Sequence, residues 1–251
     1  MSQTLLITGS SGIAAATARL AASRGNRVFI VGNRENECEE LSDQIPDLSY
    51  AVADVADYPA VQRGVAACIH KHGTVDAVFN VAGISGRSLG DGPLHECTTE
   101  AWQTLMSIHA AGTFHVCREV LRHWLGASRK GAILNTGSVL ARFPERELFA
   151  THAYAASKGA VESLSLAAAA YYAPHGIRIN VIAPGLVRTP MSTRAQANDK
   201  ILAYIAHKQP LKGDFVEPEE IARIALFLLS DESIPITGEV IRADAGWAIT
   251  G

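Results

Sequence analysis

Tyr154 and Lys158, a tyrosine and a lysine four residues apart, form the pair in this sequence with the clearest capacity for chemistry. A tyrosine hydroxyl has an ordinary pKa of about 10, so at neutral pH it is a poor base unless a nearby cation favours the phenolate. Residues spaced i and i+4 share one face of a helix. If this segment is helical, we expect the Lys158 ammonium to lower the pKa of Tyr154 and suit it to proton transfer.

Two further segments carry groups suited to a small-molecule site. Ser138 follows a short apolar run at 132–136, and residues at strand ends often face ligands, although a turn or helix cap would also explain a serine here. Gly9 and Gly12 separate the apolar run 5–8 from an alanine-rich helical pattern. Glycines in such a turn let the backbone approach a pyrophosphate, although an ordinary turn has the same composition.

Strand and helix patterns alternate along the whole chain and would position these groups. Short, mostly apolar runs predict strands at 5–8, 27–31, 49–53, 77–81, 132–136, 178–183 and 239–243. Helical patterns cover 13–24, 35–44, 60–72, 99–126, 153–173 and 218–229. Strands that are apolar throughout are typical of sheets covered on both faces. The sequence therefore predicts one α/β domain over 1–251, a Rossmann-type, doubly wound, parallel seven-stranded sheet with helices on both faces.

The segment 188–215 has weaker periodicity than the rest of the chain. It follows a predicted strand, and ligands lie at the carboxyl ends of strands in such folds. We expect this segment to be a mobile lid over the substrate.

Four motifs occur in a characteristic order: T-G-S-S-G at 8–12, N-V-A-G at 80–83, Y-A-A-S-K at 154–158 and N-V-I-A-P-G-L-V-R-T at 180–189. Each lies at the end of a predicted strand or the start of a predicted helix. The set resembles the short-chain dehydrogenase/reductase family over essentially the whole chain. The resemblance implies an enzyme that transfers hydride between a nicotinamide cofactor and a carbonyl or secondary alcohol, and that assembles as a homotetramer or homodimer.

The resemblance also implies a role for each matching residue. Tyr154 would exchange the proton with the substrate oxygen, Lys158 would in addition hold the nicotinamide ribose, and Ser138 would hydrogen-bond the substrate oxygen. Asp54 would touch the adenine ring, or cap a helix, and Thr189 would hold the carboxamide or a phosphate. The full set of implied cofactor contacts is Gly9, Ser11, Gly12, Ile13, Asn33, Arg34, Asp54, Val55, Asn80, Ala82, Gly83, Tyr154, Lys158, Pro184, Gly185, Val187 and Thr189.

Three departures from the family pattern stand out. The glycine loop is one residue shorter than usual and has the spacing T-G-x-x-G-x-x-G of the epimerase-like branch, with Ala15 in place of the last glycine. His109 occupies the place of an asparagine that supports a proton-relay water, so it would either serve that relay or simply pack. The loop 142–151 is longer than usual, and Arg142 or Arg146 could contact an acidic substrate group.

The end of the second predicted strand bears on the choice of cofactor. NAD-selective Rossmann proteins place a carboxylate there, but this chain has Gly32-Asn33-Arg34. Arg34 is suited to pair with a 2′-phosphate, which favours NADP over NAD. Against this, the segment 8–12 has no basic residue.

Composition excludes several other function classes. With a net charge of -3 and no basic run, a nucleic-acid surface is not expected. The sequence has no apolar stretch of membrane-spanning length and no leader pattern, so we expect a cytoplasmic protein that does not engage a membrane. The nine histidines form no metal-ligand motif, and the four cysteines, which form no C-x-x-C pair, are expected to be free thiols. Two rivals remain: a nucleotide-sugar epimerase-like enzyme and a non-catalytic cofactor-binding relative.

Overall fold

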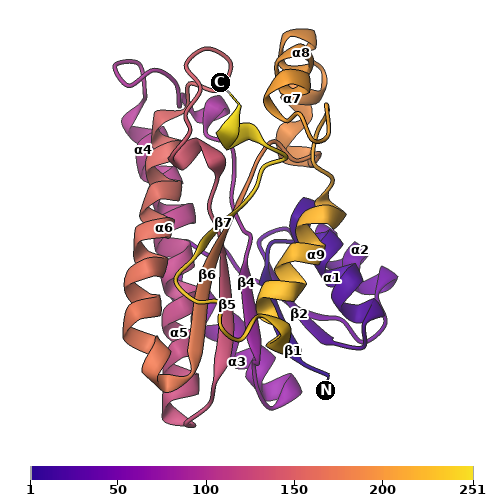
Figure 1. Cartoon of the computed structure of the whole chain (residues 1–251). Coiled ribbons are helices and arrows are strands. Elements are labelled where there is room, and N and C mark those ends of the chain that lie inside the picture. Colours follow the sequence, from indigo (N-terminus) through magenta and orange to yellow (C-terminus); the bar gives the residue numbers. More distant parts are fainter. Residues whose placement is uncertain (1, 251) are drawn as a thin grey trace.

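Seven parallel strands form one sheet in the computed structural model, which describes residues 2–250 (Figure 1). Their order across the sheet is β3-β2-β1-β4-β5-β6-β7. The strands are β1 (Thr4–Thr8), β2 (Arg27–Gly32), β3 (Ser49–Val52), β4 (Ala77–Asn80), β5 (Gly131–Thr136), β6 (Ile177–Pro184) and β7 (Val240–Ala243). The predicted fold class, a doubly wound parallel α/β sheet of seven strands, is therefore confirmed.

Helices cover both faces of the sheet because the central strands are apolar on both sides. On one face lie α1 (Gly12–Ser23), α2 (Glu35–Gln44) and α9 (Pro218–Leu229), with α1 packed against α9. On the other face lie α3 (Tyr58–His72), α5 (Gly112–Gly126) and α6 (His152–Tyr172). No helix within residues 2–250 is both long enough and apolar enough to cross a lipid bilayer.

The long helix predicted over 99–126 is not continuous. It divides into α4 (Thr99–Leu105), a π-helical turn over Met106–Ala111, and α5. A π turn inserts a residue into the helical repeat and is common at functional sites. Here the turn contains His109, whose side chain is buried against the carboxyl end of the sheet.

The predicted lid, 188–215, contains two helices that its weak periodicity did not reveal, α7 (Thr193–Gln196) and α8 (Asp199–Lys208). The side chain of Asn198 caps α8 by accepting hydrogen bonds from the first-turn amides. The base of the segment is held by a parallel bridge between Val187 and Val216, next to an ion pair of 2.9 Å between Arg188 and Glu217. In Figure 1, α7 and α8 project beyond the carboxyl ends of the strands.

The crossovers reverse direction between β1 and β4, the two strands that neighbour each other at the centre of the sheet. At such a switch point the loops leaving the two strands diverge and open a crevice at their carboxyl ends. The glycine loop follows β1, and the N-V-A-G motif closes β4. The topology therefore brings these two motifs to the mouth of one crevice.

Candidate active site

A cavity of about 440 Å³ lies at the carboxyl ends of the central strands. The glycine loop, the ends of β4, β5 and β6, the first turns of α6 and the lid segment together form its walls. All four residues predicted to act in catalysis line it: Ser138, Tyr154, Lys158 and His109. Most of the predicted cofactor contacts line it too: Gly9, Ser11, Gly12, Ile13, Ala82, Gly83, Pro184, Gly185, Val187 and Thr189, together with Tyr154 and Lys158.

The shortened glycine loop forms a tight turn that depends on its glycines. Gly9 and Gly12 adopt left-handed φ values of 95° and 52°. A Cβ atom on Gly12 would lie 3.0 Å from Cγ2 of Thr189, so the two residues are packed against each other at the cavity wall. Helix α1 begins directly at Gly12, with no side-chain cap from Ser11 and no acidic residue in its first turn. The loop therefore presents the amino end of a helix to the cavity, which is suited to binding phosphate oxygens.

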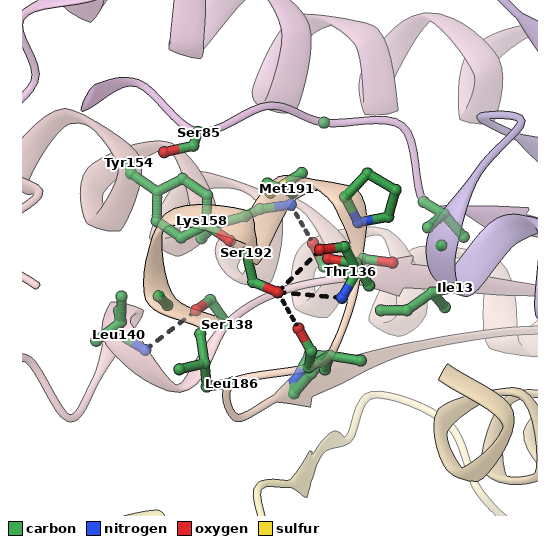
Figure 2. Close-up of a pocket in the computed structure, with 18 of the residues that line it drawn as sticks. Ile13, Ser85, Thr136, Ser138, Leu140, Tyr154, Lys158, Leu186, Met191 and Ser192 are labelled. Atoms are coloured by element: carbon green, nitrogen blue, oxygen red, sulfur yellow. Dashed lines mark hydrogen bonds between the residues drawn. The ribbon is translucent and has the colours of Figure 1, made fainter. Parts of the chain in front are cut away.

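Tyr154 lies in the first turn of α6, and its side chain points into the cavity beside Lys158 and Ser138 (Figure 2). Ser138 follows the end of β5, and its hydroxyl oxygen accepts a hydrogen bond from the amide of Leu140 at 3.2 Å. The Lys158 ammonium donates to the carbonyl oxygen of Thr136 at 2.9 Å and lies 5.8 Å from the centre of the Tyr154 ring. Serine, tyrosine and lysine thus converge on one wall.

Burial has the largest effect on the pKa values of both Tyr154 and Lys158. It raises the pKa of Tyr154, an effect that the nearby Ser138 hydroxyl only partly offsets. Burial also lowers the pKa of Lys158 to about 8. Burial outweighs any effect of the Lys158 ammonium, which is directed at Thr136, so the expectation that Lys158 lowers the pKa of Tyr154 stays a prediction. At neutral pH the Tyr154 hydroxyl keeps its proton, which is the form that donates to a substrate oxygen.

His109 is buried in the π turn and uses both ring nitrogens within the protein. Its Nε2 accepts a hydrogen bond from the Ile84 amide at 3.0 Å, so in the neutral ring Nδ1 carries the proton. Nδ1 is 2.8 Å from Oγ of Ser157, whose hydroxyl donates to the carbonyl oxygen of Tyr154 at 2.8 Å. Burial and the charge of Lys158 hold the pKa of His109 well below its ordinary value. His109 is therefore neutral and links the β4 loop to the backbone of Tyr154.

Asp91 is a site residue that the sequence patterns did not indicate. Its carboxylate accepts hydrogen bonds from the amides of Ala153 at 2.9 Å and Tyr154 at 3.0 Å, although it lies more than 60 residues away in the chain. Thr151, the residue before α6, provides no side-chain cap. Asp91 therefore caps the helix that carries Tyr154 from a distant loop, and only the tertiary structure reveals this contact.

Five predicted cofactor contacts lie outside the cavity walls. Asn33, Arg34 and Asp54 are exposed beyond the ends of β2 and β3, and Val55 packs against α5. Asn80 is buried, where its side-chain amide donates to Asn135 at 2.8 Å. Arg34 adjoins the glycine loop through Glu37, which contacts both Arg34 and Ser10.

A carboxylate that the sequence patterns did not indicate lies beside Arg34. Glu37, in the first turn of α2, accepts from the Ser10 hydroxyl at 2.7 Å and pairs with Arg34 at 2.6 Å. Burial alone would raise the pKa of Glu37, but these two partners lower it. Gly32, at the end of β2, provides no carboxylate of the kind that NAD-selective proteins carry in this region, and a Cβ there would lie 2.7 Å from Sγ of Cys38. Because Arg34 pairs with Glu37, the charge of Arg34 is already balanced within the protein.

The arginines of the long loop before α6 do not reach the cavity. Arg142 pairs with the buried carboxylate of Glu162 at 2.6 Å. Arg146 is almost fully exposed and lies 3.3 Å from Glu147. The expectation that either arginine contacts a substrate is not supported by their positions. Within residues 2–250, no cluster of three or more histidine, cysteine or acidic side chains is arranged to hold a metal ion.

Comparisons with known proteins agree with this geometry. A family model described as enoyl-(acyl carrier protein) reductase matches residues 7–248. The chain is 32% identical over 247 residues to cis-4-hydroxycyclohexanecarboxylate dehydrogenase of Sinomonas cyclohexanicum, a match covering 96% of this chain and 95% of that protein. A short-chain type dehydrogenase/reductase from Mycobacterium ulcerans superimposes with a TM-score of 0.90 at 28% identity, covering 100% of this chain and 92% of that one. For 3-ketoacyl-(acyl-carrier-protein) reductase from Brucella melitensis, complexed with NADH, the TM-score is 0.87 at 25% identity, covering 98% of each chain.

Proposed function

The chain is a member of the short-chain dehydrogenase/reductase family and an oxidoreductase of alcohol and carbonyl groups, and we propose that Tyr154 is its acid and base. The observation that carries this proposal is the convergence of Ser138, Tyr154 and Lys158 on the cavity that the glycine loop also lines. A nicotinamide cofactor is supported by the family and by the relative complexed with NADH. We propose that this chain depends on NAD(H) or NADP(H) for the interconversion of a secondary alcohol and a ketone.

The cavity fits such a cofactor at both of its ends. The uncapped amino end of α1 and the left-handed turn at Gly12 suit a pyrophosphate. Lys158 has one proton engaged by Thr136 and two more available for ribose hydroxyls. Thr189, which lies against Gly12 at the cavity wall, is placed to hold the carboxamide or a phosphate.

In this mechanism the protein positions the reacting groups and manages one proton. The nicotinamide, when bound, supplies or accepts the hydride. Ser138 donates a hydrogen bond to the substrate oxygen and fixes it near the Tyr154 hydroxyl. In reduction Tyr154 gives its proton to that oxygen, and in oxidation it takes the proton back. The charge of Lys158 favours the tyrosinate that reduction leaves behind once the ammonium turns toward it.

We propose that His109 and Asp91 act on this reaction by positioning Tyr154. Both ring nitrogens of His109 are occupied by Ile84 and Ser157, so the ring is better placed to fix the backbone of Tyr154 than to relay protons. Gly83 makes room for the ring, because a Cβ there would lie 3.0 Å from Nε2. Asp91 holds the first amides of α6 from the opposite side.

For the cofactor we propose NAD(H) over NADP(H), which reverses the preference that Arg34 alone indicates. Glu37 neutralises Arg34 and adds a carboxylate beside the glycine loop. A carboxylate at this position accepts hydrogen bonds from ribose hydroxyls and repels a 2′-phosphate. Because a side chain at Gly32 would require Cys38 to shift, Glu37 would supply the acid that is absent from the end of β2.

The assembly we propose is a homotetramer, or the dimer from which it is built. Trp102 and Phe114 on α4 and α5, and Leu166 on α6, are large apolar residues with about two-fifths of their surface exposed. These helices would pair with a second copy, which would cover the apolar residues. A monomeric mass by light scattering would reject this assembly.

The proposed activity is tested by a panel of secondary alcohols and ketones assayed with NAD(H) and NADP(H), following the absorbance of the reduced nicotinamide. The panel begins with ring alcohols, since one relative is named for a hydroxylated cyclohexane carboxylate. We expect cofactor-dependent turnover by the wild type that Tyr154→Phe nearly abolishes while cofactor binding is unchanged. Turnover that survives in Tyr154→Phe contradicts the assigned role, and cofactor binding without turnover of any member favours a non-catalytic relative.

A further inference from the structure

The substrate end of the cavity carries two arginines that the reaction described above does not use. Arg87 lies in a short 3₁₀ turn after β4, and Arg194 lies in α7 of the lid. Both side chains line the cavity, and both donate to the same acceptor, the carbonyl oxygen of Leu148, at 2.6 Å and 3.3 Å. Two guanidinium groups from separate segments therefore meet beside the loop that joins Ser138 to Tyr154.

No acidic group balances these two charges within the described part of the chain. Neither arginine lies within 4 Å of a carboxylate of residues 2–250, whereas Arg34, Arg142 and Arg188 each have an acidic partner. The two acids of that loop are engaged elsewhere, because Glu145 accepts from the amides of residues 147–149 and Glu147 lies 3.3 Å from Arg146. The cavity walls include the cationic side chains of Arg87, Arg194 and Lys158 but no aspartate or glutamate. Like charges brought together at the edge of a cavity favour an anion between them.

The cavity that holds the arginines and the reacting groups also has apolar walls. Leu140, Phe149, Leu186, Met191 and Trp247 line it. A ligand that binds Tyr154 and the arginines together would also contact this apolar lining. Such a wall binds a hydrocarbon body, while the arginines at the rim bind a charged end.

We propose that Arg87 and Arg194 form a subsite for an anionic oxygen group, so that the substrate is a secondary alcohol or ketone with a carboxylate or similar anion at its far end. This inference rests on the proposed function and adds the substrate class. It places the contact with an acidic substrate on Arg87 and Arg194, instead of on Arg142 or Arg146. Each charged hydrogen bond contributes about 1.5–3 kcal/mol, which corresponds to about a tenfold or larger preference for the anion.

The experiment measures binding without turnover. The protein is loaded with oxidised cofactor, with which a ketone cannot exchange hydride, and titrated calorimetrically with matched ketone probes. The probe pairs are 4-oxocyclohexanecarboxylate with its amide and 4-oxopentanoate with its amide. We expect at least one carboxylate to bind about tenfold or more tightly than its amide. The preference should be lost in the Arg87→Gln/Arg194→Gln double variant, kept in the Arg87→Lys/Arg194→Lys variant, and unchanged in Arg146→Gln.

The possible results separate this proposal from the activity itself. If no carboxylate binds more tightly than its amide, or if the preference survives the double glutamine variant, the anionic subsite is rejected. A loss of cofactor affinity in the glutamine variants would reveal that they are unfolded. In that case the lysine variants, which keep the charge and the fold, test the subsite: their preference for the carboxylate over the amide should depend on ionic strength. Loss of cofactor binding in the wild type would contradict the proposed function, while titration of the free protein with the same probes would still test the arginines.

Discussion

The floor of the cavity and its rim are built in different ways. Lys158 and His109 on the floor are buried and hydrogen-bond to the backbone, and Tyr154 lies on the same helix as Lys158, with its main-chain amide held by Asp91. At the substrate rim Arg87 lies in a 3₁₀ turn and Arg194 in α7, and at the cofactor rim Arg34 directly precedes α2; Arg34 and Arg194 are exposed and Arg87 is half-buried. We propose that the floor groups move a proton, a role that requires rigid geometry. The rim holds charges that select ligands, so we expect floor variants to change kcat and rim variants to change KM.

The largest effect should come from the floor, at the proton-donating hydroxyl. Tyr154→Phe removes the hydroxyl and keeps the aromatic ring, whose centre lies 5.4 Å from the centre of the His109 ring. General acid–base catalysis contributes about 10²–10⁴-fold, so kcat should fall by that factor. KM and the melting temperature should change little, as measured by steady-state kinetics and calorimetry. A loss confined to KM would place Tyr154 among the binding groups and remove the distinction between floor and rim.

Lys158→Met should inactivate the enzyme and stabilise the protein without ligand. The pKa of the Lys158 ammonium falls from about 10.4 in an unfolded chain to about 8 in the folded protein, so its burial costs about 3 kcal/mol of stability. Replacing the lysine removes this cost but also loses the hydrogen bond to Thr136, which contributes about 1 kcal/mol. Below pH 8 the variant should therefore gain about 2 kcal/mol in the free energy of unfolding.

The pH dependence provides the control for this prediction. Between the two pKa values the unfolded chain holds a proton that the folded protein has released, so wild-type stability rises with pH and the difference between the proteins shrinks. Denaturant titrations of both proteins at a series of pH values measure this difference in stability. A variant that is less stable at every pH would show that the ammonium is stabilising where it lies.

His109→Asn should cost about 1–2 kcal/mol in stability, because the shorter side chain cannot reach both Ile84 and Ser157. Folded His109 resists protonation while an unfolded histidine binds a proton below about pH 6.5, so wild-type stability falls as the pH drops below that value. In the His109→Asn variant, stability should no longer show this fall with decreasing pH. The pH profile of kcat should stay the same if His109 positions Tyr154, whereas a shifted profile would assign it to the proton relay.

The smallest effect is expected at the cofactor rim, where the side chains of Arg34 and Glu37 are both partly solvated. Glu37→Gln should free Arg34 and improve the ratio of kcat/KM for NADPH to that for NADH by about three- to tenfold, equivalent to about 1 kcal/mol. Arg146→Gln, which removes another arginine paired with a glutamate but far from the glycine loop, is the matched control. An unchanged ratio in Glu37→Gln would show that the carboxylate does not select the cofactor.

The same contrast explains what the sequence could and could not predict. Tyr154, Lys158 and the glycine loop were predictable because their relations are local: a helical spacing and a strand–turn–helix pattern. Asp91 and Glu37 act through contacts across 63 and 27 residues of chain, which no spacing rule encodes. The meeting of Arg87 with Arg194 likewise depends on how two loops pack. The π turn at His109 was missed because the apolar periodicity runs through it without a break.

The central claim is that this cavity holds a nicotinamide cofactor, and calorimetric titration with NADH and NADPH tests it most directly. Gly12→Ala is the informative variant, because its new Cβ meets both a left-handed φ and Thr189 at 3.0 Å, whereas the Cβ of Gly126→Ala meets nothing within 4 Å. We expect micromolar binding, tighter for NADH, that is weakened about tenfold or more in Gly12→Ala, since a strained residue costs about 1–3 kcal/mol. Binding should be unchanged in Gly126→Ala. If the wild type binds neither nucleotide, the account of this site is contradicted.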